Sequence, residues 1–131
     1  MKALKSLIDL AKHKNHIDMK RGEEKYMNPH WHLDAIKAEV EEVREELRPN
    51  NMVHLEDELC DILWGWMILV EKLKESDYVG SHEAIISRAL KKYEERILAL
   101  KGNAEDHLIW KEVKARQKVM LEVEKGKNNE N

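Results

Sequence analysis

Hydrophobic residues recur at helical spacing along almost the whole chain. In the first segment Leu4, Leu7, Ile8 and Ala11 fall on one face, and Asn15 extends the same stripe. Turn-forming residues interrupt this periodicity at Gly22 to Pro29, at "RPNN", at "SDYVGS" and at Gly102. The pattern therefore predicts helices over residues 2–19, 32–47, 53–75, 82–101 and 104–124, in a single domain over residues 1–125, with a polar, disordered tail at 126–131.

The segment at 53–75 departs from the usual one-sided pattern of a surface helix. Its core stripe consists of Leu55, Leu59, Ile62, Trp66, Leu69 and Leu73, yet Cys60, Trp64, Met67 and Ile68 put apolar side chains on other faces. A helix that is apolar nearly all round is central in its domain or lies at an oligomer interface. We therefore predict self-association through this helix, as a homodimer or homotetramer. Cys60 is expected to be a buried, reduced thiol, and Trp64 and Trp66 to lie on opposite sides, one in the core and one at the interface.

Composition agrees with an all-α fold, a four- to five-helix bundle. The chain has only 5 Gly and 2 Pro and no Phe, whereas turn-rich β folds need many more turn residues. With 23 basic and 26 acidic residues, the net charge is −3, so no broad basic surface for nucleic acid is expected. Charges within the first apolar segment argue against a signal peptide or a membrane span, and we expect a cytoplasmic protein without a membrane partner.

Two pairs of acidic residues three positions apart stand beside the apolar stripes of neighbouring helices. Glu39 and Glu42 lie roughly 70° and 130° to one side of the core direction of the helix at 32–47, at about 100° per residue. Glu58 and Asp61 lie on the same side of the next helix by similar angles. The short "RPNNM" connection predicts that the two helices pack as an antiparallel hairpin, although equal phase does not by itself bring the two pairs together.

Acidic residues at this spacing usually pair with Lys or Arg in water, and Glu41 and Glu45 fit that ordinary interpretation. Carboxylates beside a buried seam instead repel each other and lose hydration, so they need a compensating cation. Mg²⁺ prefers such oxygen ligands together with water and phosphate. A di-iron bundle site needs two Glu-x-x-His pairs, and no Glu in this chain has His three positions later. His13 and His16 lack a third ligand and are expected on a solvated helix face.

Several segments together resemble the MazG-type nucleoside triphosphate pyrophosphohydrolases. "EVEE" from Glu39 and "ELCD" from Glu58 are similar to the family's ExxE…ExxD signature, and "DELCDILWGWMILV" resembles its Glu-Leu-x-Asp-hydrophobic helix. "ISRALKKYEERI" resembles the later basic helix, and "WKEVKARQK" the Trp-x-x-hydrophobic-Lys segment. The resemblance covers about residues 30–118. Ala38 stands where the family often has another acid, and "ILALKG" replaces the His-Pro-His segment of longer members.

This resemblance implies Mg²⁺-dependent hydrolysis, with Mn²⁺ as the alternative metal, of a (d)NTP to the monophosphate and pyrophosphate, in house-cleaning of the nucleotide pool. It implies that Glu39, Glu42, Glu58 and Asp61 bind the metal, and that Lys92, Arg96 and Lys114 contact phosphates, within one subunit or across a subunit boundary. Glu42 is the first candidate for the general base. Two alternatives stay open: a phosphoribosyl-ATP pyrophosphohydrolase-like enzyme and a non-catalytic helical interaction module.

The segment "NPHWH" before the second predicted helix offers an aromatic candidate for substrate binding. Trp31 could stack on a nucleobase, with Asn28 and His32 beside it. The alternative, which we favour from the sequence, is that Trp31 anchors this loop onto the bundle. Trp110 is expected to be structural.

Overall fold

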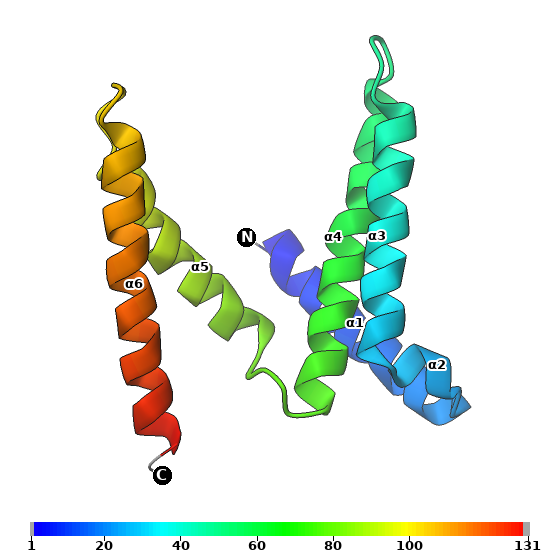
Figure 1. Ribbon diagram of the computed structural model, residues 1–131. Coiled ribbons are helices and arrows are strands. Elements are labelled where there is room, and N and C mark those ends of the chain that lie inside the picture. The colour runs from blue at the N-terminus through cyan, green and yellow to red at the C-terminus, as the bar shows by residue number, and fades with distance from the viewer. Residues whose placement is uncertain (1, 130–131) are drawn as a thin grey trace. The chain divides into compact units, whose positions relative to one another are not determined.

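A computed structural model describes residues 2–129, and within them the chain forms six helices and no strand. The helices are α1 (Lys2–Arg21), α2 (Glu24–Met27), α3 (Pro29–Glu46), α4 (Met52–Glu75), α5 (His82–Ile97) and α6 (Asp106–Asn129) (Figure 1). The all-α prediction is therefore confirmed. The chain divides into two compact units, Met1–His82 and Glu83–Asn131, and the predicted single domain stays a prediction.

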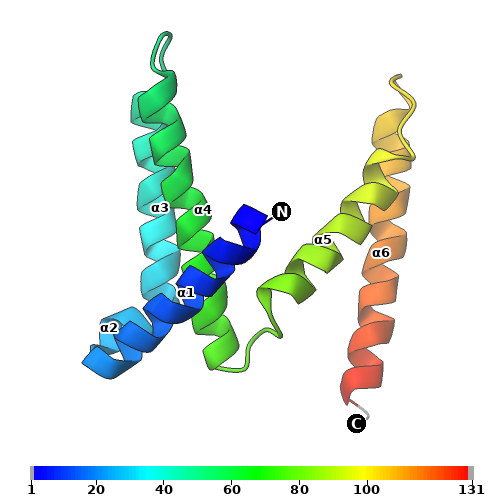
Figure 2. The same ribbon diagram turned by 180° about the vertical axis from the view of Figure 1, so that it is seen from behind.

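The first unit is built on the hairpin of α3 and α4, which pack side by side, with α1 across α4 (Figures 1 and 2). Its core includes the buried Ile8 and Ala11 of α1 and the buried Met67–Val70 stretch of α4, two helices that contact each other. Gly65 allows α3 and α4 to approach closely, because a Cβ atom at this position would lie 2.9 Å from Cγ1 of Ile36. The hairpin predicted from the short connection is thus present.

Helix α3 begins earlier than predicted, because Pro29 starts it instead of ending a loop. Proline suits the first turn of a helix, where its missing N–H needs no partner. The Asn28 side chain caps this turn by accepting a hydrogen bond from the His30 backbone N–H at 2.9 Å. The single turn α2 was not predicted. Helix α5 ends at Ile97 and not at the predicted residue 101. Gly102 does have a left-handed φ of 85°, but it lies in the loop five residues past the helix, so it does not end α5.

Three predictions about burial and order differ from the structure. Cys60 is exposed, and so is Leu59 at 48%, because the halves of α3 and α4 nearest their turn contact each other and leave their outer faces free. Helix α6 continues through residues 126–129, which the sequence assigns to a disordered tail, since the strong helix formers at 121–125 carry the helix across Gly126. Residues 130–131 of that tail lie outside the described residues.

In the second unit, side chains of α5 and α6 join the two helices. Arg96 donates a hydrogen bond to Oε1 of Gln117 at 2.8 Å, and Gln117 donates to the Lys92 carbonyl at 3.0 Å. Arg88 forms a two-point ion pair with Glu124. None of the helices in the described part of the chain is long and apolar enough to cross a membrane.

Candidate metal centre and adjoining cavity

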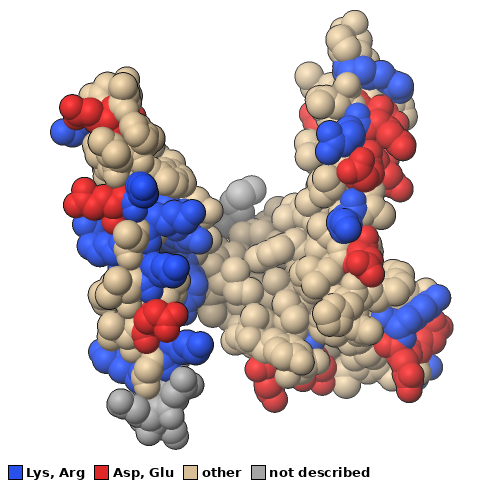
Figure 3. All heavy atoms as spheres, viewed as in Figure 1, with Lys and Arg blue, Asp and Glu red and all other residues tan. Residues whose placement is uncertain are grey.

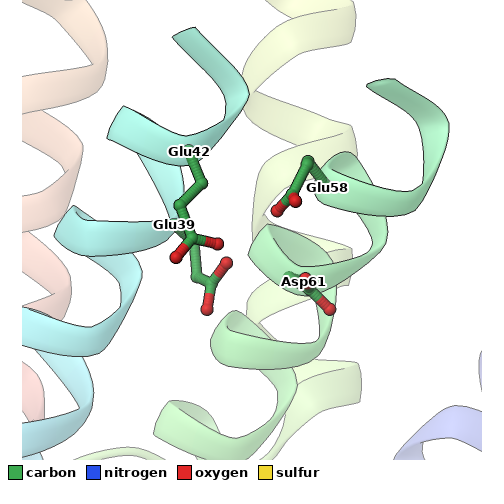
Figure 4. A group of neighbouring side chains, drawn as sticks. All are labelled: Glu39, Glu42, Glu58 and Asp61. Atoms are coloured by element: carbon green, nitrogen blue, oxygen red, sulfur yellow. The ribbon is translucent and has the colours of Figure 1, made fainter. Parts of the chain in front are cut away.

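The four acidic residues singled out in the sequence converge on one place between α3 and α4. Glu39 and Glu42 project from α3, and Glu58 and Asp61 from α4, each pair one helical turn apart (Figure 4). One carboxylate oxygen from each residue lies within 4.8 Å of those of the other three. The structure therefore brings these four side chains together, while their role as metal ligands stays a prediction.

The electrostatics of this acidic cluster are unfavourable without a cation. One oxygen of Glu39 and one of Glu58 are buried without a hydrogen-bond partner, and no ion pair joins the four carboxylates to Lys or Arg within the described residues. Burial, followed by the neighbouring carboxylates, raises the pKa of Glu39 to about 7. The same causes raise the pKa of Glu58. A hard divalent cation fits this all-oxygen donor set.

Other acids on α3 show the ordinary surface arrangement. Glu41 pairs with Arg44 at 3.1 Å, and both side chains are exposed. Glu45 is exposed and is not part of the cluster. The phase argument thus separates the acids of the cluster, Glu39 and Glu42, from Glu41 and Glu45 on the same helix.

A cavity of about 240 Å³ adjoins the acidic cluster within the first unit. Glu39 and Asp61 contribute to its lining, as do the aromatic side chains of Tyr26, Trp31 and Trp64. Trp31 meets the edge of Tyr26 with ring centroids 5.0 Å apart, which joins α2 to α3, while Trp31 is 40% exposed; its role as an anchor on the bundle stays a prediction. It also faces the cavity, and its stacking on a base stays a prediction.

The other members of the "NPHWH" segment have structural roles. Asn28 caps α3, and the buried His32 donates from Nε2 to the Tyr26 carbonyl at 2.7 Å. Burial lowers the pKa of His32, despite that hydrogen bond. The ring is therefore neutral at pH 7, with its proton on Nε2.

The polar wall of the cavity was not predicted from the sequence. It comprises Lys14 and Asp18 of α1, and behind Asp18 lies Lys72 of α4, whose Nζ donates to both Asn15 and Asp18 at 2.7 Å. The sequence does carry an indication of buried polar residues here, because Asp18 follows Asn15 by three residues on the apolar face of α1. The crossing of α1 over α4, which brings in Lys72, could not be inferred from the periodicity.

The predicted phosphate contacts all lie in the second unit. Lys92, Arg96 and Lys114 line a groove of about 900 Å³ along α5 and α6, where lysine and arginine side chains gather (Figure 3). The buried Arg96 guanidinium lies 5.3 Å from the ring centroid of Trp110, which supports a structural role for that tryptophan. The sequence missed Gln117, which joins Arg96 to Glu95.

Comparison with known families finds one matching family model. Residues 27–98 match the family model described as the MazG nucleotide pyrophosphohydrolase domain. The match spans more than half of the chain and includes all four carboxylates, Lys92 and Arg96, but not Lys14, Asp18 or Lys114. No curated protein and no solved structure matches the chain. The chain belongs to the MazG nucleotide pyrophosphohydrolase domain family.

Proposed function

We propose that the protein is a Mg²⁺-dependent nucleoside triphosphate pyrophosphohydrolase that cleaves a (d)NTP to the (d)NMP and pyrophosphate in house-cleaning of the nucleotide pool. Family membership supports nucleotide pyrophosphohydrolase activity in general. The observation that carries the finer proposal is the convergence of four carboxylates within 4.8 Å, two of them with a buried, unpaired oxygen.

The four carboxylates divide into two pairs with different surroundings. Glu39 and Glu58 are half-buried and hold the side of the site nearest the helix seam, whereas Glu42 and Asp61 are exposed. When bound, the divalent cation supplies positive charge at the phosphates and makes the attacking water more acidic. Glu42 is our candidate to accept the proton of that water, because its carboxylate is open to solvent.

Hydrolysis at the α-phosphorus breaks its bond to the bridging oxygen and releases pyrophosphate with the electron pair of that bond. The negative charge that builds on the leaving group requires cationic partners. Lys92, Arg96 and Lys114 are the proposed partners, supported by their place in a basic groove and by the family match over the first two.

The test is pyrophosphate release from a panel of NTPs and dNTPs, with and without Mg²⁺. Glu58→Gln and Asp61→Asn should each abolish release while the helical circular dichroism is unchanged. Glu45→Gln is the matched control, because it neutralises an exposed acid on α3 outside the cluster, and it should keep full activity. Full activity in either cluster variant would refute the assignment and favour a non-catalytic interaction module, and activity confined to phosphoribosyl-ATP would favour that alternative enzyme.

A further inference from the structure

The polar wall of the cavity beside the acidic cluster is a fixed network of charges. Asp18 accepts hydrogen bonds from Lys14 and from Lys72, and Asn15 accepts a second bond from Lys72. The side chains of Asp18 and Lys72 are 1% and 0% exposed, whereas that of Lys14 is 39% exposed. Of the three charged groups, Lys14 is therefore the one that a molecule in the cavity can reach.

The ionisation of Asp18 in this wall is set by its two lysine partners. Burial acts to raise the pKa of Asp18, but the hydrogen bonds and charges of Lys14 and Lys72 outweigh it and leave that pKa below its ordinary value. Asp18 is therefore ionised, and each of its oxygens already receives a lysine N–H. Lys72 already donates to Asn15, Asp18 and the sulfur of Met27, so the spare N–H donors of this wall belong to Lys14.

The rest of the lining suits a flat aromatic ring. Tyr26, Trp31 and Trp64 provide aromatic surface, and Glu39 and Asp61 place the cavity directly against the acidic cluster. The ammonium of Lys14 is itself held 5.6 Å from the Tyr26 ring centroid. A ligand here meets aromatic faces, one directed cationic donor and, at its other end, the proposed metal site.

We propose that Lys14, positioned by Asp18 and Lys72 in the lining of this cavity, selects nucleobases that carry an exocyclic oxygen over adenine, an inference that rests on the proposed function. An ammonium group only donates hydrogen bonds, so it matches the exocyclic oxygen of guanine, cytosine, uracil or thymine. Adenine carries an amino group, itself a donor, in place of the guanine oxygen and keeps only its ring nitrogens as acceptors. Hydrogen bonds to charged groups are strong enough to give roughly ten- to a hundredfold discrimination.

Binding is measured with α,β-imido analogues of GTP and ATP, which cannot release pyrophosphate. Trp31 and Trp64 line the cavity, so tryptophan fluorescence reports its occupancy. The wild-type protein should bind the GTP analogue roughly tenfold or more tightly than the ATP analogue. Lys14→Gln should reduce this ratio to within about twofold by weakening the GTP analogue, and Lys14→Arg, which keeps a cationic donor, should retain most of it.

Lys20→Gln is the matched control, because Lys20 is an exposed residue of the same helix and does not line the cavity, and it should leave both dissociation constants unchanged. Equal wild-type affinity for the two analogues, or a Lys14→Gln effect of the same size on both, would overturn the inference. Failure of this inference is distinguishable from failure of the proposed function. If Asp61→Asn abolishes pyrophosphate release but the wild-type protein shows no base preference, only the role of Lys14 is overturned. Absence of triphosphate hydrolysis in the wild-type protein overturns the proposed function itself.

Discussion

The buried ion pair between Lys72 and Asp18 offers a direct test of how the first unit is held together. Lys72→Met keeps the length of the side chain and removes its ammonium. Asn15 then loses its hydrogen-bond donor, and Asp18 keeps only the partly exposed Lys14 as a cationic partner. Because Asp18 is 1% exposed, bulk water solvates it poorly and does not make up for the missing ammonium.

The size of the effect follows from this geometry. Removing one partner of a buried ion pair costs about 3–5 kcal/mol, and the surviving contact with Lys14 places the expected loss near the lower end, at about 3 kcal/mol. A domain of this size has about 5–15 kcal/mol of unfolding free energy. The substitution should therefore remove a large part of the stability and lower Tm by roughly 10 °C.

The free energy of unfolding is measured by urea denaturation followed by circular dichroism. The double variant Asp18→Asn, Lys72→Met should recover part of the loss, because it no longer buries an unmatched charge. Lys74→Met is the control on the same helix: its side chain is 38% exposed, and its contact with Glu71 is 3.8 Å long, so the change should stay within about 0.5 kcal/mol. A loss below about 1 kcal/mol for Lys72→Met would refute the reasoning.

Four further predictions concern the acidic cluster, the hairpin and assembly. Because the pKa of Glu39 rises from 4.5 to about 7, folded metal-free protein holds a proton that the unfolded chain releases, so stability should fall as pH rises through that window. We expect the free energy of unfolding to fall by about 1 kcal/mol, well below the full equivalent of the pKa change, because Glu39 is only half-buried and water screens its charge. Urea titrations at pH 5 and pH 8 should show this loss, and Glu39→Gln should remove the pH dependence. Mg²⁺ binding should strengthen over the same window as that proton is released, and a pH-independent affinity by calorimetry would contradict this. Gly65→Ala places a Cβ atom 2.9 Å from Cγ1 of Ile36 and should lower the free energy of unfolding by about 1–3 kcal/mol. A thermal melt measures this loss, and an unchanged Tm would contradict the prediction, because it would show that α3 and α4 can move apart at no energetic cost. Sedimentation at tens of micromolar should give a mass above the 15.5 kDa of one chain, and a monomer would contradict the prediction of self-association.

The acidic cluster could be predicted from the sequence because its geometry is periodic. Glu39 and Glu42 on one helix and Glu58 and Asp61 on the next flank their apolar stripes in the same phase, and a short turn forces the helices to pack antiparallel. Those two facts bring the pairs to the same seam. The distance between the two acidic pairs also depends on how far one helix is shifted along the other. The sequence does not give this shift; in the structure the two helices approach closely at Gly65.

The wall of the cavity could not be predicted for the opposite reason. Lys14 and Asp18 read as an ordinary i, i+4 pair on a charged helix, and Lys72 as one more lysine near the end of α4. The burial of Asp18 and Lys72 depends on the crossing of α1 over α4, which leaves no periodic trace in the sequence. The prediction that Cys60 is buried was wrong for the same reason. Apolar neighbours along the chain do not reveal which faces of a helix lack a packing partner.

Mn²⁺ binding followed by electron paramagnetic resonance tests the cation site itself without relying on turnover. Wild-type protein should remove free Mn²⁺ from solution, Glu45→Gln should do so equally well, and Glu58→Gln and Asp61→Asn should leave the signal of free Mn²⁺ undiminished. Equal Mn²⁺ binding by the wild-type protein and the two cluster variants, or none by the wild-type protein even with a triphosphate analogue present, would contradict the role of the four carboxylates as one metal site.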